Sequence, residues 1–210
     1  MNLQLALDRL TREECLRIID ETRDSIDWIE VGTSVIKEYG MAIVREIKEK
    51  YPDKVIVTDM KTMDAGGHEA IQAFKSGADI TTVMALASDL TILDSIKVAK
   101  EYGVRVMVDL LEVSSMERIK ALERLGVDLV SIHIGKDKQR EGKFDVKYFS
   151  LVEDCDFEVT VAGGVDLNTL PAVLEKGPDT VIIGSAITNA EQPGEVAAQM
   201  KKLMNKYSSN

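Results

Sequence analysis

The sequence predicts a (β/α)8 barrel, and three observations support this fold class. Short runs rich in β-branched residues alternate with amphipathic stretches along the whole chain. Eight such runs occur, and strands that alternate with helices form parallel β-α units. The length of 210 residues suits one domain, and barrels of this class can be this short. A doubly wound open sheet is the structural alternative.

The elements follow one another without a break. The predicted strands are Leu3–Asp8, Ile26–Gly32, Lys54–Asp59, Asp79–Met84, Val104–Asp109, Asp128–His133, Phe157–Ala162 and Thr180–Gly184. Helical patterns such as REECLRIIDETR and SSMERIKALERLG lie between them, and Gly103 and Gly126 stand just past two helix ends. No linker rich in proline, glycine or serine divides the chain, so we expect a single domain over residues 1–210, frayed after about residue 205.

Composition excludes several classes of protein. The formal net charge is −10, and an acidic surface repels nucleic acid and anionic membranes. Cys15 and Cys155 lie far apart and neither belongs to a CxxC pair, which favours two reduced thiols. No signal peptide or membrane-spanning apolar run occurs. We therefore expect a cytoplasmic protein that binds neither nucleic acid nor membrane.

Strand alternation predicts which side chains enter the barrel. In the first strand Leu3, Leu5 and Leu7 share one face, and smaller or polar residues share the other. The apolar face should meet the helices, so that the other face points inward. The inward residues at the carboxyl ends of the strands are then Asp8, Glu30, Asp59, Lys61, Asp109, His133, Gly163, Gly164 and Gly184. Barrel enzymes keep their chemistry on this rim, so we expect a catalytic site there.

The stretch VTDMKTMDAGG crowds three charged residues, Asp59, Lys61 and Asp64, around the end of the third strand. Several carboxylates in close proximity cannot all stay ionised without a cation. Lys61 offers one positive charge, and a divalent metal with oxygen ligands, Mg²⁺ or Mn²⁺, would offer more. A lysine ringed by carboxylates stays protonated and can stabilise an oxyanion, whereas a Schiff-base lysine needs a lowered pKa. A salt-bridge network that only closes the barrel top is the structural alternative.

Two glycine loops predict a phosphate site. VAGGV follows the seventh strand and IIGSAIT follows the eighth, and loops at these positions often hold phosphate through backbone N–H groups. The motifs of nucleotide cofactors are absent. A phosphorylated small substrate, a divalent metal, a protonated lysine and a candidate base, His133, together indicate chemistry through an enolate or enediolate.

The segments LQLALD, DWIEVGT, TDMKTMDAGG, SIHIG, VAGGV and IIGSAIT together resemble the 3-hexulose-6-phosphate synthases of the orotidine 5′-phosphate decarboxylase suprafamily. The resemblance runs from Leu3 to about Thr188. D-x-K-x-x-D at Asp59, Lys61 and Asp64 matches the hallmark of the suprafamily. The resemblance implies homodimeric barrels with active sites at the dimer interface. It also implies aldol addition of formaldehyde to D-ribulose 5-phosphate, giving D-arabino-hex-3-ulose 6-phosphate, and the reverse reaction.

The resemblance also assigns roles. Glu30 and Asp59 would bind Mg²⁺, Asp64 would reach into the site of the partner subunit, and Asp8 would contact substrate hydroxyls. Lys61 would stabilise the enediolate, and His133 would move the proton at C1. The phosphate would be held by Gly163, Gly164, Gly184 and Ser185.

Alternatives and departures accompany this assignment. The related 3-keto-L-gulonate-6-phosphate decarboxylases share the metal and lysine sites, but HIGK and GSA in this chain favour the synthase. A non-catalytic sugar-phosphate sensor is the third hypothesis. Ile134 stands where synthases carry threonine, and Trp28 should enter the barrel where an aliphatic residue is usual. Asp109 and Glu112 could form a second acid pair, but we expect them to hold the fifth loop or contact a substrate hydroxyl. Lys136, Lys138 and Arg140 should form a solvated basic patch that could steer sugar phosphates.

Overall fold

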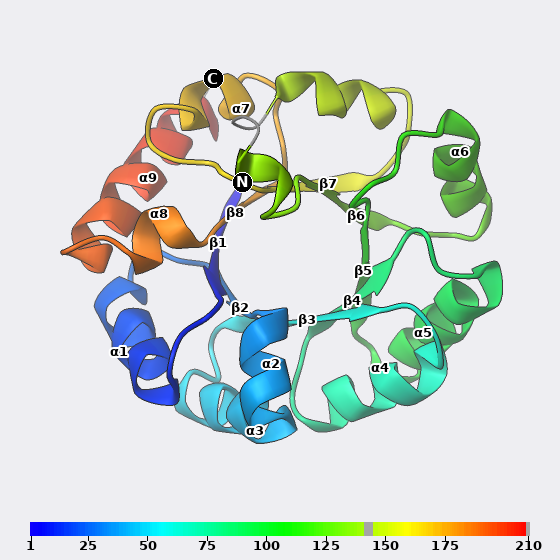
Figure 1. Ribbon diagram of the computed structural model, residues 1–210, viewed down its shortest axis with the longest axis horizontal. Coiled ribbons are helices and arrows are strands. Elements are labelled where there is room, and N and C mark those ends of the chain that lie inside the picture. Colours follow the sequence, from blue (N-terminus) through cyan, green and yellow to red (C-terminus); the bar gives the residue numbers. More distant parts are fainter. Residues whose placement is uncertain (141–144, 209–210) are drawn as a thin grey trace.

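Eight parallel strands pair in sequence order and close into a ring, as Figure 1 shows. β1 pairs with β8, with Asn2 opposite Thr180 and Leu5 opposite Ile183, so the predicted (β/α)8 barrel is confirmed and the open sheet is wrong. The computed structural model describes residues 1–140 and 145–208. The strands are β1 (Asn2–Leu7), β2 (Trp28–Val31), β3 (Val55–Thr62), β4 (Ile80–Met84), β5 (Arg105–Asp109), β6 (Leu129–His133), β7 (Glu158–Ala162) and β8 (Thr180–Ile183).

Helices surround the ring of strands (Figure 1). They are α1 (Arg12–Thr22), α2 (Thr33–Tyr39), α3 (Met41–Lys50), α4 (Gly66–Lys75), α5 (Asp89–Tyr102), α6 (Met116–Arg124), α7 (Leu170–Leu174), α8 (Ser185–Thr188), α9 (Pro193–Ser208) and the 3-10 turns η1 (Lys138–Arg140) and η2 (Val146–Leu151). Local signals set their ends: Thr11 and Glu14 form a capping box before α1, and Gly103 ends α5 in the left-handed conformation. Of the tail predicted to fray, residues 209–210 lie outside the described residues. Within the described ranges, no helix has the length and apolar character needed to span a membrane.

Alternating side chains divide the apolar residues into two cores. Leu3, Leu5 and Leu7 are fully buried between β1 and the helices, as the strand pattern predicts. A second core fills the barrel interior and consists of Trp28, Val57, Ile80, Met107, Leu129, Ala162 and Ile182. The interior is therefore packed, and its polar residues gather at one end.

Trp28 occupies the floor of that interior. Its side chain is only 8% exposed, and it lies opposite Gln4 on β1 and Val55 on β3. Glu30 follows two residues later on the same face of β2, one layer nearer the carboxyl end of the barrel. The large indole thus fills the layer beneath the carboxylates and leaves the mouth open.

β3 departs from regular alternation where Lys61 stands. The strand was expected to end at Asp59 but continues to Thr62, and its register with β4 shifts between Thr58 and Thr62. Lys61 has a φ of 48°, and its backbone N–H donates to Oγ1 of Thr82 at 2.9 Å. A bulge of this kind turns a side chain in a new direction. Lys61 lines the mouth of the barrel, as alternation predicts, although the strand carries it there through a bulge and not by regular pairing.

Replacing Trp28 with alanine is expected to lower the free energy of unfolding by about 3–5 kcal/mol, because the interior core would contain a cavity. Urea unfolding followed by circular dichroism measures the change, since Trp28 is the only tryptophan and its fluorescence is lost. Trp28→Phe keeps an aromatic ring and should cost less. An alanine variant as stable as the wild type would contradict this description of the core.

Candidate functional site

A cavity of about 510 Å³ opens among the carboxyl ends of the strands. All the predicted site residues except Asp64 line it. The lining includes Asp8, Glu30, Asp59, Lys61, His133, Gly163, Gly164, Gly184 and Ser185. Strands that are distant in sequence therefore bring the predicted rim residues to one cavity.

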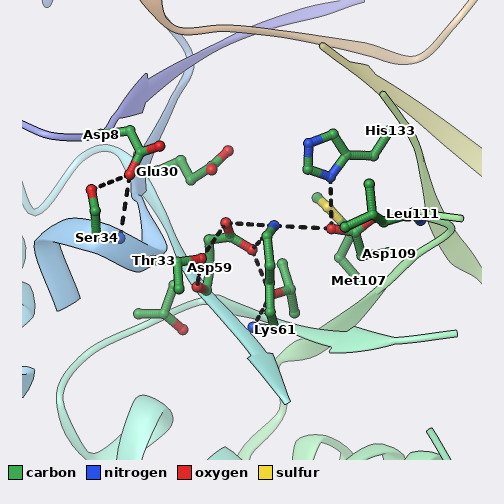
Figure 2. Close-up of polar contacts among 12 residues, drawn as sticks. Asp8, Glu30, Thr33, Ser34, Asp59, Lys61, Met107, Asp109, Leu111 and His133 are labelled. Carbon is green, nitrogen blue, oxygen red and sulfur yellow. Dashed lines mark hydrogen bonds and ion pairs between the residues drawn. The ribbon is translucent and has the colours of Figure 1, made fainter. Parts of the chain in front are cut away.

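Lys61 lies between two carboxylates, as Figure 2 shows. Its Nζ atom is 2.9 and 2.8 Å from the two oxygens of Asp59 and 3.0 Å from Oδ2 of Asp109. Burial alone would lower the pKa of Lys61, but the charges of Asp59 and Asp109 raise it above its usual range. The amine is therefore protonated, as predicted, and it can stabilise negative charge.

Asp59 is oriented from both sides. Thr33, the first residue of α2, donates from Oγ1 to Oδ2 of Asp59 at 2.8 Å, and Thr82 on β4 donates to Oδ1 at 2.9 Å. The Lys61 ammonium contacts both oxygens. Three elements thus fix the direction of one carboxylate.

Asp109 connects Lys61 to His133. Its Oδ2 atom lies 2.9 Å from Nδ1 of His133, and its Oδ1 accepts from the backbone N–H of Leu111 at 2.9 Å. Burial would raise the pKa of Asp109, but the hydrogen bond and charge of His133 and the charge of Lys61 lower it to about 2. An ionised carboxylate only accepts, so Nδ1 of His133 carries a proton, and Nε2 is the basic nitrogen of the neutral ring.

The imidazole of His133 is tuned by the same contact. Burial would lower its pKa, yet the hydrogen bond and charge of Asp109 raise the pKa above its ordinary value. Asp109 thus makes the imidazole a stronger base, which suits it to accept a proton. His133 lines the cavity, so the geometry supports the predicted role in moving a proton.

Glu30 is buried beneath the mouth with few donors. Its Oε2 atom accepts from Nε2 of Gln4 at 2.5 Å, and Oε1 of Gln4 has no hydrogen-bond partner among the described residues. Burial and then the charge of Asp59 raise the pKa of Glu30 to about 8, although Lys61 lowers it in part. Asp59 and Asp109 form ion pairs, so Glu30 is the buried carboxylate of the cavity that has none among the described residues.

This donor set is compatible with a hard divalent cation. Within residues 1–140 and 145–208, no group of three or more His, Cys, Asp or Glu side chains is arranged to hold a metal. Mg²⁺, however, is commonly held by one or two carboxylates with water and substrate oxygens. The buried Glu30, destabilised as an anion by Asp59, and the unpartnered oxygen of Gln4 fit a cation at this point.

Asp8 lies on the outer rim, away from the Lys61 cluster (Figure 2). Its Oδ1 atom accepts from Oγ of Ser34 and, at 3.3 Å, from the backbone N–H of the same residue. The side chain is exposed, so its charge is solvated. Asp8 is placed to meet a ligand at the entrance of the cavity.

The loop after β7 requires glycine at one position in particular. Gly163 has a φ of 112°, and a Cβ atom there would come within 2.4 Å of the backbone oxygen of Ile134. Gly164 is also left-handed, with a φ of 74°. Gly184 ends β8, and α8 begins at Ser185, so uncharged backbone lines this side of the cavity. We call Gly163, Gly164, Gly184 and Ser185 the glycine cradle.

Asp64 is not among the residues that line the cavity of its own chain. It is exposed, and its Oδ1 accepts from the N–H of Ala65 at 2.8 Å. Asp109, by contrast, was missing from the predicted catalytic set. It holds the fifth loop through Leu111, as expected, but its pairing with Lys61 and His133 was not foreseen, and Glu112 instead contacts Lys138. Its inward position at the end of β5 was the signal that could have found it.

Asp109→Asn is expected to lower the pKa of His133, because a neutral amide removes the charge that favours the imidazolium. NMR titration of the ring protons measures this change. The exposed His68 is the other histidine and serves as an internal control. An unchanged His133 titration would contradict the coupling described here.

Known proteins of similar sequence and fold identify the family of this chain. The model of the orotidine 5′-phosphate decarboxylase / HUMPS family matches residues 1–200. The 3-hexulose-6-phosphate synthase of Bacillus subtilis (strain 168) is 39% identical over 207 residues, which cover 97% of this chain and 99% of that protein. The crystal structure of 3-hexulose-6-phosphate synthase from Salmonella typhimurium superposes with a TM-score of 0.96 at 37% identity, covering 99% of this chain and 100% of that one.

A second group of structures is also similar. A crystal structure of KGPDC from Streptococcus mutans has a TM-score of 0.92 at 26% identity, covering 98% of each chain. The synthases are more similar to this chain in sequence, which confirms the resemblance found in the sequence motifs. This chain belongs to the orotidine 5′-phosphate decarboxylase / HUMPS family of enzymes.

Proposed function

We propose that this enzyme is an aldolase that adds formaldehyde to D-ribulose 5-phosphate and forms D-arabino-hex-3-ulose 6-phosphate reversibly. The observation that carries the proposal is the shared carboxylate of Asp109, which places a protonated Lys61 beside the basic His133 at the cavity. This pair suits removal of a proton next to a carbonyl, with the oxyanion stabilised as it forms. Names of relatives at up to 39% identity agree with that chemistry.

The chemistry begins with a proton at C1 of the ketose. Nε2 of His133 takes this proton, and the electron pair left behind delocalises onto the C2 oxygen as a 1,2-enediolate. The ammonium of Lys61 stabilises the negative oxygen, while Asp109 stabilises the imidazolium. The glycine cradle holds the phosphate, and Asp8 meets the sugar hydroxyls at the rim.

Carbon–carbon bond formation completes the reaction. The electron pair of the enediolate at C1 attacks the carbon of formaldehyde, whose carbonyl π electrons move onto its oxygen. That oxygen receives the proton from His133 and becomes the new hydroxymethyl group. Glu30 and Asp59 would hold Mg²⁺ or Mn²⁺, which when bound supplies positive charge beside the developing oxyanion.

A decarboxylase acting on 3-keto-L-gulonate 6-phosphate is the second candidate. Similarity to KGPDC from Streptococcus mutans favours it, since the fold and the lysine site could serve that reaction through the same enediolate. The lower sequence identity, 26% against 37% and 39% for the two synthases described above, places it second.

Proton exchange separates these candidates. In D₂O with Mg²⁺, the enzyme should exchange the C1 protons of ribulose 5-phosphate for deuterium, which NMR follows. Added formaldehyde should then give a six-carbon product.

Lys61→Ala is expected to slow this exchange by about 10²–10³-fold, because the oxyanion loses its charged partner. Lys202→Ala, an exposed lysine on α9, is the control. Glu30→Gln or a chelator should also slow exchange. Exchange without product would favour the decarboxylase, and no exchange would refute both.

We also propose a homodimer whose sites are shared between subunits. Asp64 lies outside the cavity of its own chain, and the preceding residue, Met63, has an exposed apolar side chain. Leu86, Leu90 and Leu93 are exposed as well, and Leu90 is 72% exposed. Apolar side chains so exposed suit burial against a second copy of the chain.

Mixing Lys61→Ala and Asp64→Ala chains should restore about a quarter of wild-type activity, because half of the randomly formed dimers would hold one intact site of two. Activity of the refolded mixture measures this. Mixing Lys61→Ala with Glu30→Gln is the control, since both changes fall in a chain's own cavity and restore nothing. Equal activity in the two mixtures would contradict the shared site.

A further inference from the structure

The glycine cradle has no charge of its own, and its surroundings are acidic. A phosphate monoester carries about −1.5 to −2 charges near neutral pH. The chain has a net charge of −10, and the same cavity is lined by the carboxylates of Asp8, Glu30, Asp59 and Asp109. A phosphate anion entering this field is repelled unless a cation lies next to the cradle.

Position leaves one candidate for that cation. Within the described residues, the lysines and arginines that line the cavity are Arg9, Lys37, Lys61 and Lys136. Lys61 is held by Asp59 and Asp109. Arg9 lies beside the start of α2, where its backbone N–H donates to Oγ of Ser34. Lys37 is on the same helix as Ser34. Lys136 alone has its Nζ atom at the cradle, 3.4 Å from Oγ of Ser185.

Lys136 also differs from its neighbours in charge pairing. Lys138 forms an ion pair with Glu112 at 2.7 Å, and Arg140 lies 3.5 Å from Asp137. Among the residues that the structure describes, no carboxylate comes within 4.0 Å of the Lys136 ammonium. Its side chain is exposed, so it can bind an anion without first breaking a salt bridge.

The segment that carries Lys136 is fixed to the cradle. Ile134 donates from its N–H to the carbonyl of Ala162 at 3.0 Å, and its own carbonyl accepts from Nε2 of Gln139 at 2.9 Å. The side chain of Gln139 lies 3.6 Å from where a Cβ atom of Gly164 would be. Lys136 stands between these two anchors, so its backbone is held beside the cradle.

We propose that Lys136 binds the phosphate group of the substrate and supplies the positive charge that the glycine cradle lacks. The choice of a sugar phosphate rests on the proposed function. The binding itself requires only a phosphate group, so inorganic phosphate can probe it.

Lys136→Gln tests the proposal by calorimetry and kinetics. The Kd for inorganic phosphate and the KM for ribulose 5-phosphate are expected to rise by about tenfold or more, because one charge-assisted contact is lost. The loss should fall on KM more than on kcat, since the phosphate stays bound throughout the reaction. Lys136→Arg should restore much of the binding. Lys138→Gln, on the same loop but paired with Glu112, is the matched control, and circular dichroism verifies folding.

Several outcomes would overturn the inference. Phosphate binding by Lys136→Gln that equals the wild type would do so, and so would an equal loss in Lys138→Gln or no phosphate binding by the wild type. Failure of the proposed function has a different signature. In that case the wild type would not exchange C1 protons, while phosphate binding would still depend on Lys136.

Discussion

The candidate site is arranged around the contact of one ammonium group with two buried carboxylates. Asp109 is 3% exposed in its side chain and Asp59 10%, so both would be costly to keep ionised without Lys61. Their remaining oxygen positions are filled by Thr33, Thr82 and the N–H of Leu111. Because these donors come from α2, β4 and the loop after β5, the closed barrel and the charged cluster stabilise the same geometry.

The two buried acids Asp109 and Glu30 differ in pKa mainly because their neighbours differ. Asp109 has a lysine, an imidazole and a backbone N–H, and its pKa falls to about 2. Glu30 has mainly the amide of Gln4, and its pKa rises to about 8. One carboxylate is therefore kept as a permanent anion that orients His133, while the other favours the arrival of a cation. The same cavity thus contains Asp109, whose negative charge is balanced by Lys61, and Glu30, whose ionised form would be stabilised by a bound cation.

The barrel, its strand order and most of the rim followed from sequence because they depend on period-two patterns and on residues at strand ends. The rest depends on contacts between distant segments. The bulge at Lys61 needs the hydroxyl of Thr82 on the next strand, and the value of Asp109 lies in two partners that are 48 and 24 residues away. Trp28 fits because the interior layer around it is formed by other strands.

β6 joins the two halves of the cavity. His133 ends the strand on the side of the Lys61 cluster, and Lys136 lies three residues later beside the cradle. Ile134 between them packs its side chain into the core, while its backbone contacts Ala162, Gln139 and the space above Gly163. The backbone of this residue fixes the loop, so the departure from threonine leaves that geometry in place. One short segment thus holds His133, the proposed base, and Lys136, the proposed phosphate ligand, at a set separation.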